Sequence, residues 1–310
     1  MIRRIGRSIW ARAAVTMAVL VVLLSRVDLR DTLGALRRLD LGLAALVAVL
    51  LVVDRGIMIW RWVILLRARE VPVSVSAAAR IFLVSSFVGA STALAGDAAR
   101  AYSLSRHTHG SEAVASVAVD RMLGMLGIVA VGLLGLAAAG ASLRGESGLS
   151  FVVTAAVLSV MAVAALSADQ WMHYAVPGRF HDATLGRRVL TMASALGAYR
   201  GHRAALAGVM ALSTLVQLVR ILQAYLLGLA IGIVVPFSYY LLFMPAGLVA
   251  LMLPISIAGF GAPQGLIVWL LQPRGVPVPD ALALSTLIVL SGLAANLPGA
   301  LLVLLGRRRA

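Results

Sequence analysis

The sequence predicts an all-α polytopic membrane protein, and its composition and its apolar segments support this fold class. Of the 310 residues, 61% are hydrophobic and 13% are charged, whereas a soluble domain is about half apolar and a quarter charged. The mean hydropathy is +0.99. Apolar runs recur along the whole chain, and several approach the ~20 residues that a helix needs to cross a bilayer. No long polar stretch separates them, so we expect residues 1–310 to form one integral membrane domain.

Eight segments are predicted to cross the membrane as helices: 9–25, 40–66, 112–140, 149–167, 204–231, 237–253, 257–272 and 281–305. The first of them follows three arginines (Arg3, Arg4 and Arg7) and could belong to a signal peptide. No A-x-A-like cleavage site follows its apolar run, and many further spans come after it, so a retained first helix is favoured.

Two apolar segments, near 76–100 and 254–272, contain residues that break helices, and we expect each to enter the membrane and turn back. Glycines and hydroxyl residues interrupt the first segment. Two prolines and several glycines interrupt the second, and they are incompatible with a regular helix. A pair of broken segments, one in each half of the chain, points to a transporter-type binding site. The alternative is that the glycines only allow helices to pack closely.

The formal net charge of +15 would suggest nucleic-acid binding in a soluble protein. Here the basic residues cluster at the ends of apolar segments, which is typical of topology signals, so no nucleic-acid partner is expected. The positive-inside rule then predicts cytoplasmic N- and C-termini in the cell inner membrane. Segment 26–40 is predicted to be an amphipathic helix on the outer surface. The basic loop 168–203 either lies on the anionic inner leaflet or is a solvated connector.

No pattern in the chain indicates catalysis. The sequence has no cysteine, which excludes disulfides and thiolate ligands. It contains no HExxH, G-x-S-x-G or P-loop motif, and acidic residues are too sparse for an obvious pair of catalytic carboxylates. His107 and His109 lack a nearby carboxylate and are weak evidence for a metal. We therefore expect no enzyme activity, no metal and no cofactor.

Several charged residues lie within or beside the apolar segments: Asp54, Arg55, Arg61, Asp97, Arg100, Asp120, Arg121 and Arg220. A charge at membrane depth costs at least about 2.5–3.5 kcal/mol on insertion scales, so such residues must be used, paired or able to snorkel. Neighbours in sequence do not face each other on a helix, so Asp120 and Arg121 each need a partner elsewhere. Arginines outnumber aspartates, and a cavity with surplus guanidinium favours anionic guests, phosphate above all. Snorkelling could explain Arg61 and Arg55, but less easily Arg220.

The spacing of Asp97 and Arg100 allows two interpretations. The two residues are three apart, so on a helix they share a face. In the functional interpretation, Arg100 meets an anionic headgroup and Asp97 orients the arginine. In the structural one, Asp97 caps a helix that restarts after the flexible Gly96.

These residues carry a resemblance to a known family. The stretch Ala95-Gly96-Asp97-Ala98-Ala99-Arg100-Ala101-Tyr102, the later pair Asp120-Arg121 and a distal stretch from Pro254 to Gln264 resemble the flippase-like transmembrane domain of lysylphosphatidylglycerol synthases. The resemblance covers residues 10–305 and implies a role in moving lipids. We expect a stand-alone transmembrane domain without the soluble aminoacyl-transfer domain of the full synthases, so their synthase activity is not implied. Ala258, Pro263 and Gln264 depart from the family pattern, and the carboxylate missing at Gln264 bears on ion coupling or headgroup choice.

We therefore expect a flippase that moves the headgroup of an anionic phospholipid or a polyprenyl-linked lipid across the bacterial inner membrane. With no ATP-binding motif, movement is expected to be downhill or ion-coupled. The expected substrate-binding residues are Gly96, Asp97, Arg100, Asp120, Arg121, Arg220, Gly259, Gly261 and Gln264. Two alternatives stay open: an intramembrane transferase acting on lipid-linked phosphate or sugar, and an assembly partner of a separately encoded synthase or glycosyltransferase.

Overall fold

The computed structural model of the protein describes residues 39–90, 93–139, 184–252 and 262–307, together with a few single positions. Every regular element in these ranges is helical, as the composition predicts. The α-helices are α3 (Leu41–Ala68), α4 (Val75–Gly89), α5 (Ala93–Leu104), α6 (Gly110–Ala139), α9 (Thr184–Gly197), α10 (Arg203–Ala230), α11 (Phe237–Met252), α12 (Ala262–Leu271), α13 (Val278–Ala294) and α14 (Leu297–Arg307). Two 3₁₀ turns are also present: η3 (Ala198–Gly201) lies between α9 and α10, and η4 (Gln272–Arg274) lies between α12 and α13.

Four helical stretches of the described chain are long and apolar enough to cross a membrane: Leu41–Ala68, Gly110–Gly135, Arg203–Ala230 and Val278–Leu305. They coincide within a few residues with four of the predicted crossings. The last stretch consists of α13 and α14, which a short turn at residues 295–296 connects. The prediction of a polytopic helical membrane protein is therefore confirmed. The predicted crossings 9–25 and 149–167, and most of the predicted surface helix 26–40, lie outside the described residues.

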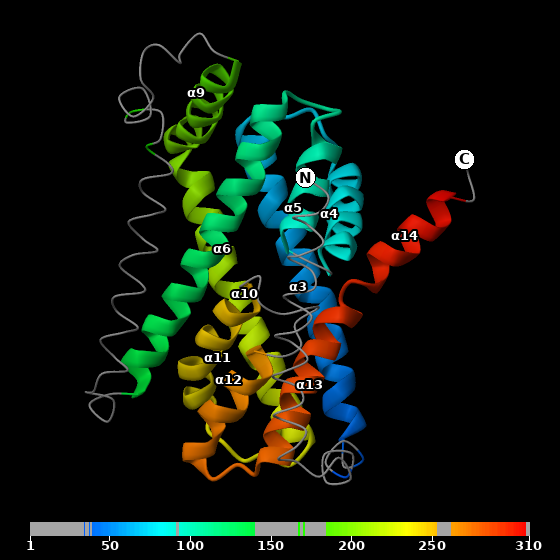
Figure 1. Ribbon diagram of the computed structural model, residues 1–310, viewed down its shortest axis with the longest axis vertical. Helices are drawn as coiled ribbons and strands as arrows, with labels where there is room; N and C mark the ends of the chain where they lie inside the picture. The colour runs from blue at the N-terminus through cyan, green and yellow to red at the C-terminus, as the bar shows by residue number, and fades with distance from the viewer. Residues whose placement is uncertain are drawn as a thin grey trace.

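The predicted crossings 237–253 and 257–272 correspond, in the described residues, to two helices shorter than the ~20 residues of a typical crossing helix. α11 has 16 residues and α12 has 10, so α11 is only about 24 Å long at 1.5 Å per residue. The hydroxyl of Tyr239, near the start of α11, donates to the backbone carbonyl of Leu270, near the end of α12, at 2.5 Å. The two helices are therefore antiparallel neighbours, as Figure 1 shows. This pairing matches the expectation of a chain that turns back, although residues 253–261 between them lie outside the described part.

The first broken segment forms a helical hairpin, as its glycines and serines predict. The Ser74 hydroxyl accepts from the Ala77 amide and caps α4, which ends at Gly89. α5 begins at Ala93 and returns toward the same end of the bundle (Figure 1). The two arms touch at Gly89 and Gly96, where a Cβ on Gly96 would lie 2.7 Å from the Gly89 Cα. Glycine is required at this contact because any side chain would push the arms apart.

Helix α10 lies at the centre of the bundle and packs against α3, α6, α11 and α13. The main apolar core forms around it and includes Ile128, Ile221, Tyr240 and Leu284, each at most 2% exposed. The end of α3 and the start of α6 meet at the same end of the bundle, where Arg69 and Glu112 form an ion pair of 2.8 Å. This packing brings the middle parts of α3, α6 and α10 together beside the α4–α5 hairpin, and the intramembrane charges lie there.

Candidate functional site

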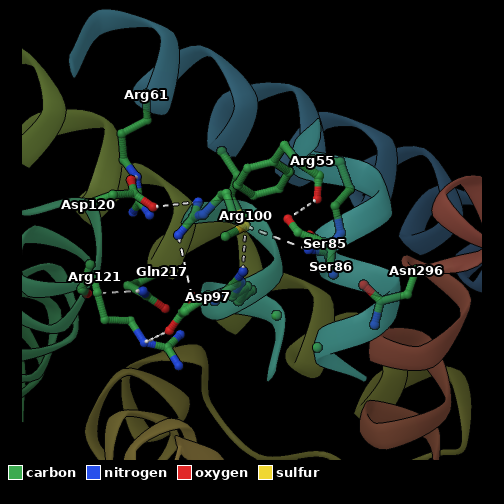
Figure 2. A pocket seen from close by; sticks show the side chains of 16 residues that line it. Arg55, Arg61, Ser85, Ser86, Asp97, Arg100, Asp120, Arg121, Gln217 and Asn296 are labelled. Atoms are coloured by element: carbon green, nitrogen blue, oxygen red, sulfur yellow. Dashed lines mark hydrogen bonds and ion pairs between the residues drawn. The ribbon is translucent and has the colours of Figure 1, made fainter. Parts of the chain in front are cut away.

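One cavity of about 330 Å³ collects most of the charged residues that the sequence places inside apolar segments. It lies among α3, α4, α5, α6 and α10, with a contribution from the turn before α14 (Figure 2). Its lining residues are Arg55, Met58, Arg61, Phe82, Ser85, Ser86, Gly89, Gly96, Asp97, Arg100, Asp120, Arg121, Gly124, Gln217, Arg220 and Asn296. Arg55 is the fifteenth of the 28 residues of α3, so the cavity lies near the middle of a membrane-spanning helix.

Asp120 is a buried residue of the cavity wall and connects two arginines. Its Oδ1 accepts from Arg61 Nε at 2.8 Å, and its Oδ2 accepts from Arg100 at 3.0 Å. Arg61 also donates to the Ser213 hydroxyl on α10 at 3.1 Å. The side chains of Asp120, Arg61 and Arg100 are only 2%, 4% and 7% exposed. Arg61 is therefore a buried ion-pair partner, and the expectation that it could snorkel is wrong.

Asp97 connects a second pair of arginines. Its Oδ1 lies 3.5 Å from Arg100, and its Oδ2 lies 3.3 Å from Arg121 Nε. α5 begins at Ala93, so Asp97 lies well inside the helix and does not cap it. The capping interpretation of Asp97 is therefore wrong, because the helix restarts before Gly96. Figure 2 shows Asp97 between Arg100 and Arg121 at the edge of the cavity.

Asp54 lies between a third pair of arginines, and its contact with Arg220 is much shorter than its contact with Arg55. Arg220 Nε donates to Asp54 at 2.9 Å, and its NH2 group lies 2.9 Å from the Met58 sulfur. Arg55 Nε lies 3.9 Å from Asp54, which is within ion-pair range but too long for a hydrogen bond. This nitrogen is buried and has no hydrogen-bond partner within the described chain. Arg55 is therefore the arginine with the weakest pairing at the site.

The five arginines fall into two groups by their accessibility. Arg61 and Arg100 are buried, and the Arg100 guanidinium also lies 5.3 Å from the Trp62 ring and 5.2 Å from the Phe82 ring. Such cation–π contacts stabilise a desolvated guanidinium. By contrast, the side chains of Arg121, Arg220 and Arg55 are 31%, 24% and 17% exposed. The second group is therefore partly accessible, whereas the first group links α3 and α5 to α6 through Asp120.

A second cavity of about 160 Å³ adjoins the first, because Arg55 and Arg220 line both. It is more apolar and is lined by Leu51, Asp54, Arg55, Arg220, Gln223, Ala224, Leu227, Met244, Ile288, Ser291, Gly292 and Ala295. The amide nitrogen of Gln223 is buried and has no hydrogen-bond partner in the described residues. The pair Arg55 and Arg220 thus separates a strongly basic space from a more apolar one.

Residues 9–299 match the family model described as the lysylphosphatidylglycerol synthase TM region. The chain belongs to this family. No curated protein matches the sequence. Family membership confirms the resemblance seen in the sequence and, with the four apolar spans, establishes a membrane protein whose function concerns lipids.

The structure of this family member brings most of the expected site residues together. Gly96, Asp97, Arg100, Asp120, Arg121 and Arg220 all line the larger cavity. Gln264 does not line either cavity: it is buried at the start of α12, and its amide lies 3.2 Å from the Thr286 hydroxyl on α13. Gly259 and Gly261 lie outside the described residues.

Several cavity residues were not among the expected site residues. Arg55 and Arg61 were noted only as intramembrane charges, although their spacing on one apolar helix was a usable signal. Ser85 and Ser86 lie in the predicted broken segment, whereas Asn296 had no signal in the sequence beyond its polarity. Gln217 belongs to a polar stripe on α10 with Arg220 and Gln223, and its amide lies 3.4 Å from the Gly124 carbonyl.

Arg69, Glu112 and Tyr199 lie where α3 ends and α6 begins, and none of them lines either cavity. The hydrogen bond to Glu112 raises the pKa of Arg69, and burial raises the pKa of Tyr199, over whose ring Arg69 lies. These contacts hold α3, α6 and η3 together at that end. Within the part of the chain that the structure describes, no three His, Asp or Glu side chains are grouped so as to hold a metal ion.

Proposed function

We propose that the protein is a lipid translocase that moves the anionic phosphate headgroup of a membrane lipid across the cell inner membrane. The observation that carries this proposal is the cavity of about 330 Å³, which lies at mid-helix depth and has five arginines in its wall. Membership in a lipid-related membrane family supports it. So does the α4–α5 hairpin, whose turn region borders the cavity at Gly89 and Gly96.

The physical task of a translocase is to replace the water around a headgroup during its passage. A charge at the bilayer centre is costly, and a phosphate without partners would meet this cost alone. Guanidinium groups can offset it, because their paired N–H groups match phosphate oxygens and stay charged at any physiological pH. The acyl chains would stay in the surrounding lipid while the headgroup passes through the cavity.

The cavity residues divide into two roles in this proposal. Arg121 and Arg220, which are partly exposed, would contact the phosphate. Asp97 and Asp54 would hold these arginines in place, because each carboxylate is bonded to one of them. The buried group of Asp120, Arg61 and Arg100 would keep α3, α5 and α6 together while the headgroup passes. Arg100 thus shifts from the contacting role expected from the sequence to a bracing role.

The orientation of the protein follows from the basic residues at one end of the bundle. Arg67, Arg69, Arg106, Arg200 and Arg203 lie where α3 and α5 end and where α10 begins. The opposite end carries Arg274 together with Asp40 and Asp280. The positive-inside rule favours a cytoplasmic position for the first end, and the α4–α5 hairpin would then enter the membrane from that side.

The test is headgroup movement in liposomes that contain the purified protein. Fluorescent anionic and zwitterionic lipids are compared by their accessibility to an impermeant quencher. Arg121→Gln is the informative variant, because Asp97 keeps its contact with Arg100 in that variant and so the fold should survive. Arg274→Gln is the matched control, since Arg274 lies outside both cavities and stacks on Tyr239.

We expect anionic-lipid movement to slow by about tenfold or more in Arg121→Gln, because a hydrogen bond to a charged group contributes about 1.5–3 kcal/mol. Arg274→Gln should move lipid at the original rate. Equal rates for Arg121→Gln and the unaltered protein would remove Arg121 from the site. No movement of any lipid by well-folded protein would reject the translocase proposal.

A further inference from the structure

The charges around the two adjoining cavities do not balance. Among the described residues, five arginines line the larger cavity, and the three aspartates that pair with them are Asp54, Asp97 and Asp120. Each aspartate is shared by two arginines, so no further carboxylate is available within this group. Five guanidinium groups against three carboxylates leave two positive charges without a counter-charge.

Two of the five cavity arginines, Arg55 and Arg121, have weaker ion pairs than the other three. Arg55 has the weakest pairing, because its closest approach to Asp54 is 3.9 Å and its buried Nε makes no hydrogen bond. Within the described residues its one hydrogen-bond contact is to the Met58 sulfur at 3.8 Å, and a thioether is a weak acceptor. Arg121 has one ion pair, of 3.3 Å, and is the most exposed of the five. The other three arginines each have an ion-pair contact of 3.0 Å or less.

Two uncompensated positive charges are costly within a membrane, so the cavity should favour a ligand whose negative charge offsets them. An uncompensated charge away from water is strongly unfavourable, whereas a partner of opposite charge with well-placed acceptors offsets the cost. A guest with one negative charge would leave one guanidinium uncompensated. A guest with two negative charges would neutralise the group. The cavity of about 330 Å³ has room for such a guest, since a water molecule occupies about 30 Å³ of the liquid.

We infer that the larger cavity binds a phosphate group with two negative charges, as in a lipid phosphomonoester or a lipid-linked diphosphate, in preference to the singly charged phosphodiester of ordinary phospholipids. The assignment of this phosphate to a lipid rests on the proposed translocase function. The charge of the guest rests on the arginine and aspartate contacts alone. The inference narrows the substrate class from anionic lipids in general to lipids with a doubly charged headgroup.

The experiment compares two lipids that differ only in this charge. Purified full-length protein in detergent is titrated with phosphatidic acid, a phosphomonoester, and with phosphatidylmethanol, a phosphodiester with the same acyl chains. Binding is followed by the rise in unfolding temperature. The second pKa of a phosphomonoester is near 6, so titrations at about pH 8 and about pH 5 compare its doubly and singly charged forms.

We expect phosphatidic acid to bind about tenfold more tightly than phosphatidylmethanol at about pH 8, and the preference to disappear at about pH 5. Arg55→Gln should abolish the preference, because it lowers the surplus to one charge. This variant should fold, since Arg55 makes no strong hydrogen bond in the described chain. Arg274→Gln removes an arginine outside the cavities and should keep the preference. A third probe, the soluble glycerol 3-phosphate, carries the same phosphomonoester without acyl chains and should bind more weakly than phosphatidic acid.

Each other outcome overturns a defined part of the inference. Equal affinity for the two lipids at about pH 8 would reject a doubly charged guest, while Arg121-dependent movement in liposomes would still uphold the translocase function. Glycerol 3-phosphate binding as tightly as the lipid would reject the lipid assignment and leave a site for a soluble phosphate. Binding of neither lipid would overturn the inference. A clear preference for the doubly charged lipid without any lipid movement would keep the binding site and reject the translocase.

Discussion

The shared carboxylate of Asp120 offers the sharpest test of how the bundle tolerates charge. In Asp120→Asn the side chain keeps its shape but loses its charge, so Arg61 and Arg100 lose their closest ion-pair partner. Arg100 keeps the longer ion pair with Asp97 at 3.5 Å and its contacts with two aromatic rings, and Arg61 keeps its hydrogen bond to the Ser213 hydroxyl. Removing one member of a buried ion pair typically costs about 3–5 kcal/mol. Since proteins are stable by only about 5–15 kcal/mol in total, this loss should be large.

The assay is equilibrium unfolding of the purified protein in detergent micelles with increasing SDS, followed by helical circular dichroism. Glu70→Gln is the matched control, because it makes the same kind of change at an exposed acid and should alter stability by no more than about 0.5 kcal/mol. The double variant Asp120→Asn with Arg61→Met should be more stable than Asp120→Asn alone, because one uncompensated guanidinium is gone. A loss below about 1 kcal/mol in Asp120→Asn would refute the argument that a charged Asp120 stabilises the bundle.

Three further outcomes are expected from single substitutions. Gly96→Ala should destabilise the protein by about 1–3 kcal/mol, because the new methyl group meets the Gly89 backbone. Gly208→Ala is the control and should not destabilise it, because a methyl group there meets nothing within 4 Å. Thermal unfolding compares the two variants. Arg100→Gln should lower the yield of folded protein, since Asp120 would lose one of its two partners; size-exclusion chromatography measures this yield, and folded material at normal yield would contradict the bracing role. Gln264→Leu should leave lipid movement unchanged because Gln264 lines neither cavity; slowed movement in liposomes would return this residue to the site.

The class of the fold and the first hairpin could be predicted from sequence because both depend on local composition. Long apolar runs mark α3, α6 and α10, whose ends are set by polar residues such as Asp40, which accepts from the Gly42 amide at 2.7 Å. Glycines and serines mark the turn between α4 and α5. The predicted segment 237–253 coincides with α11 to within one residue, because hydropathy reports where a helix is apolar.

The partners within the site could not be predicted, because they are far apart in the sequence. Arg61 and Asp120 are separated by 59 positions, and no local pattern indicates which intramembrane acid each arginine meets. The sequence did indicate that Asp120 and Arg121 need different partners, since neighbours on a helix diverge. It left open whether Asp97 caps a helix, because helix starts are hard to locate near glycine, and the start of α5 at Ala93 excludes the cap. Gln264 was expected at the site from its position in a family pattern, and the packing of α12 on α13 places it elsewhere.

The long sequence separation of these ion pairs has a consequence for how the protein is made. α3 leaves the ribosome with Asp54, Arg55 and Arg61 in its sequence, but the partner of Arg61 is synthesised 59 residues later and Arg220 is 166 residues beyond Asp54. At about 5–20 residues per second, Asp54 waits roughly 8–33 s for Arg220. During this interval each unpaired charge on α3 costs about 2.5–3.5 kcal/mol if it faces lipid. The charges of α3 are therefore fully paired only after α6 and α10 have been synthesised, so the order of synthesis sets when the charged site can assemble.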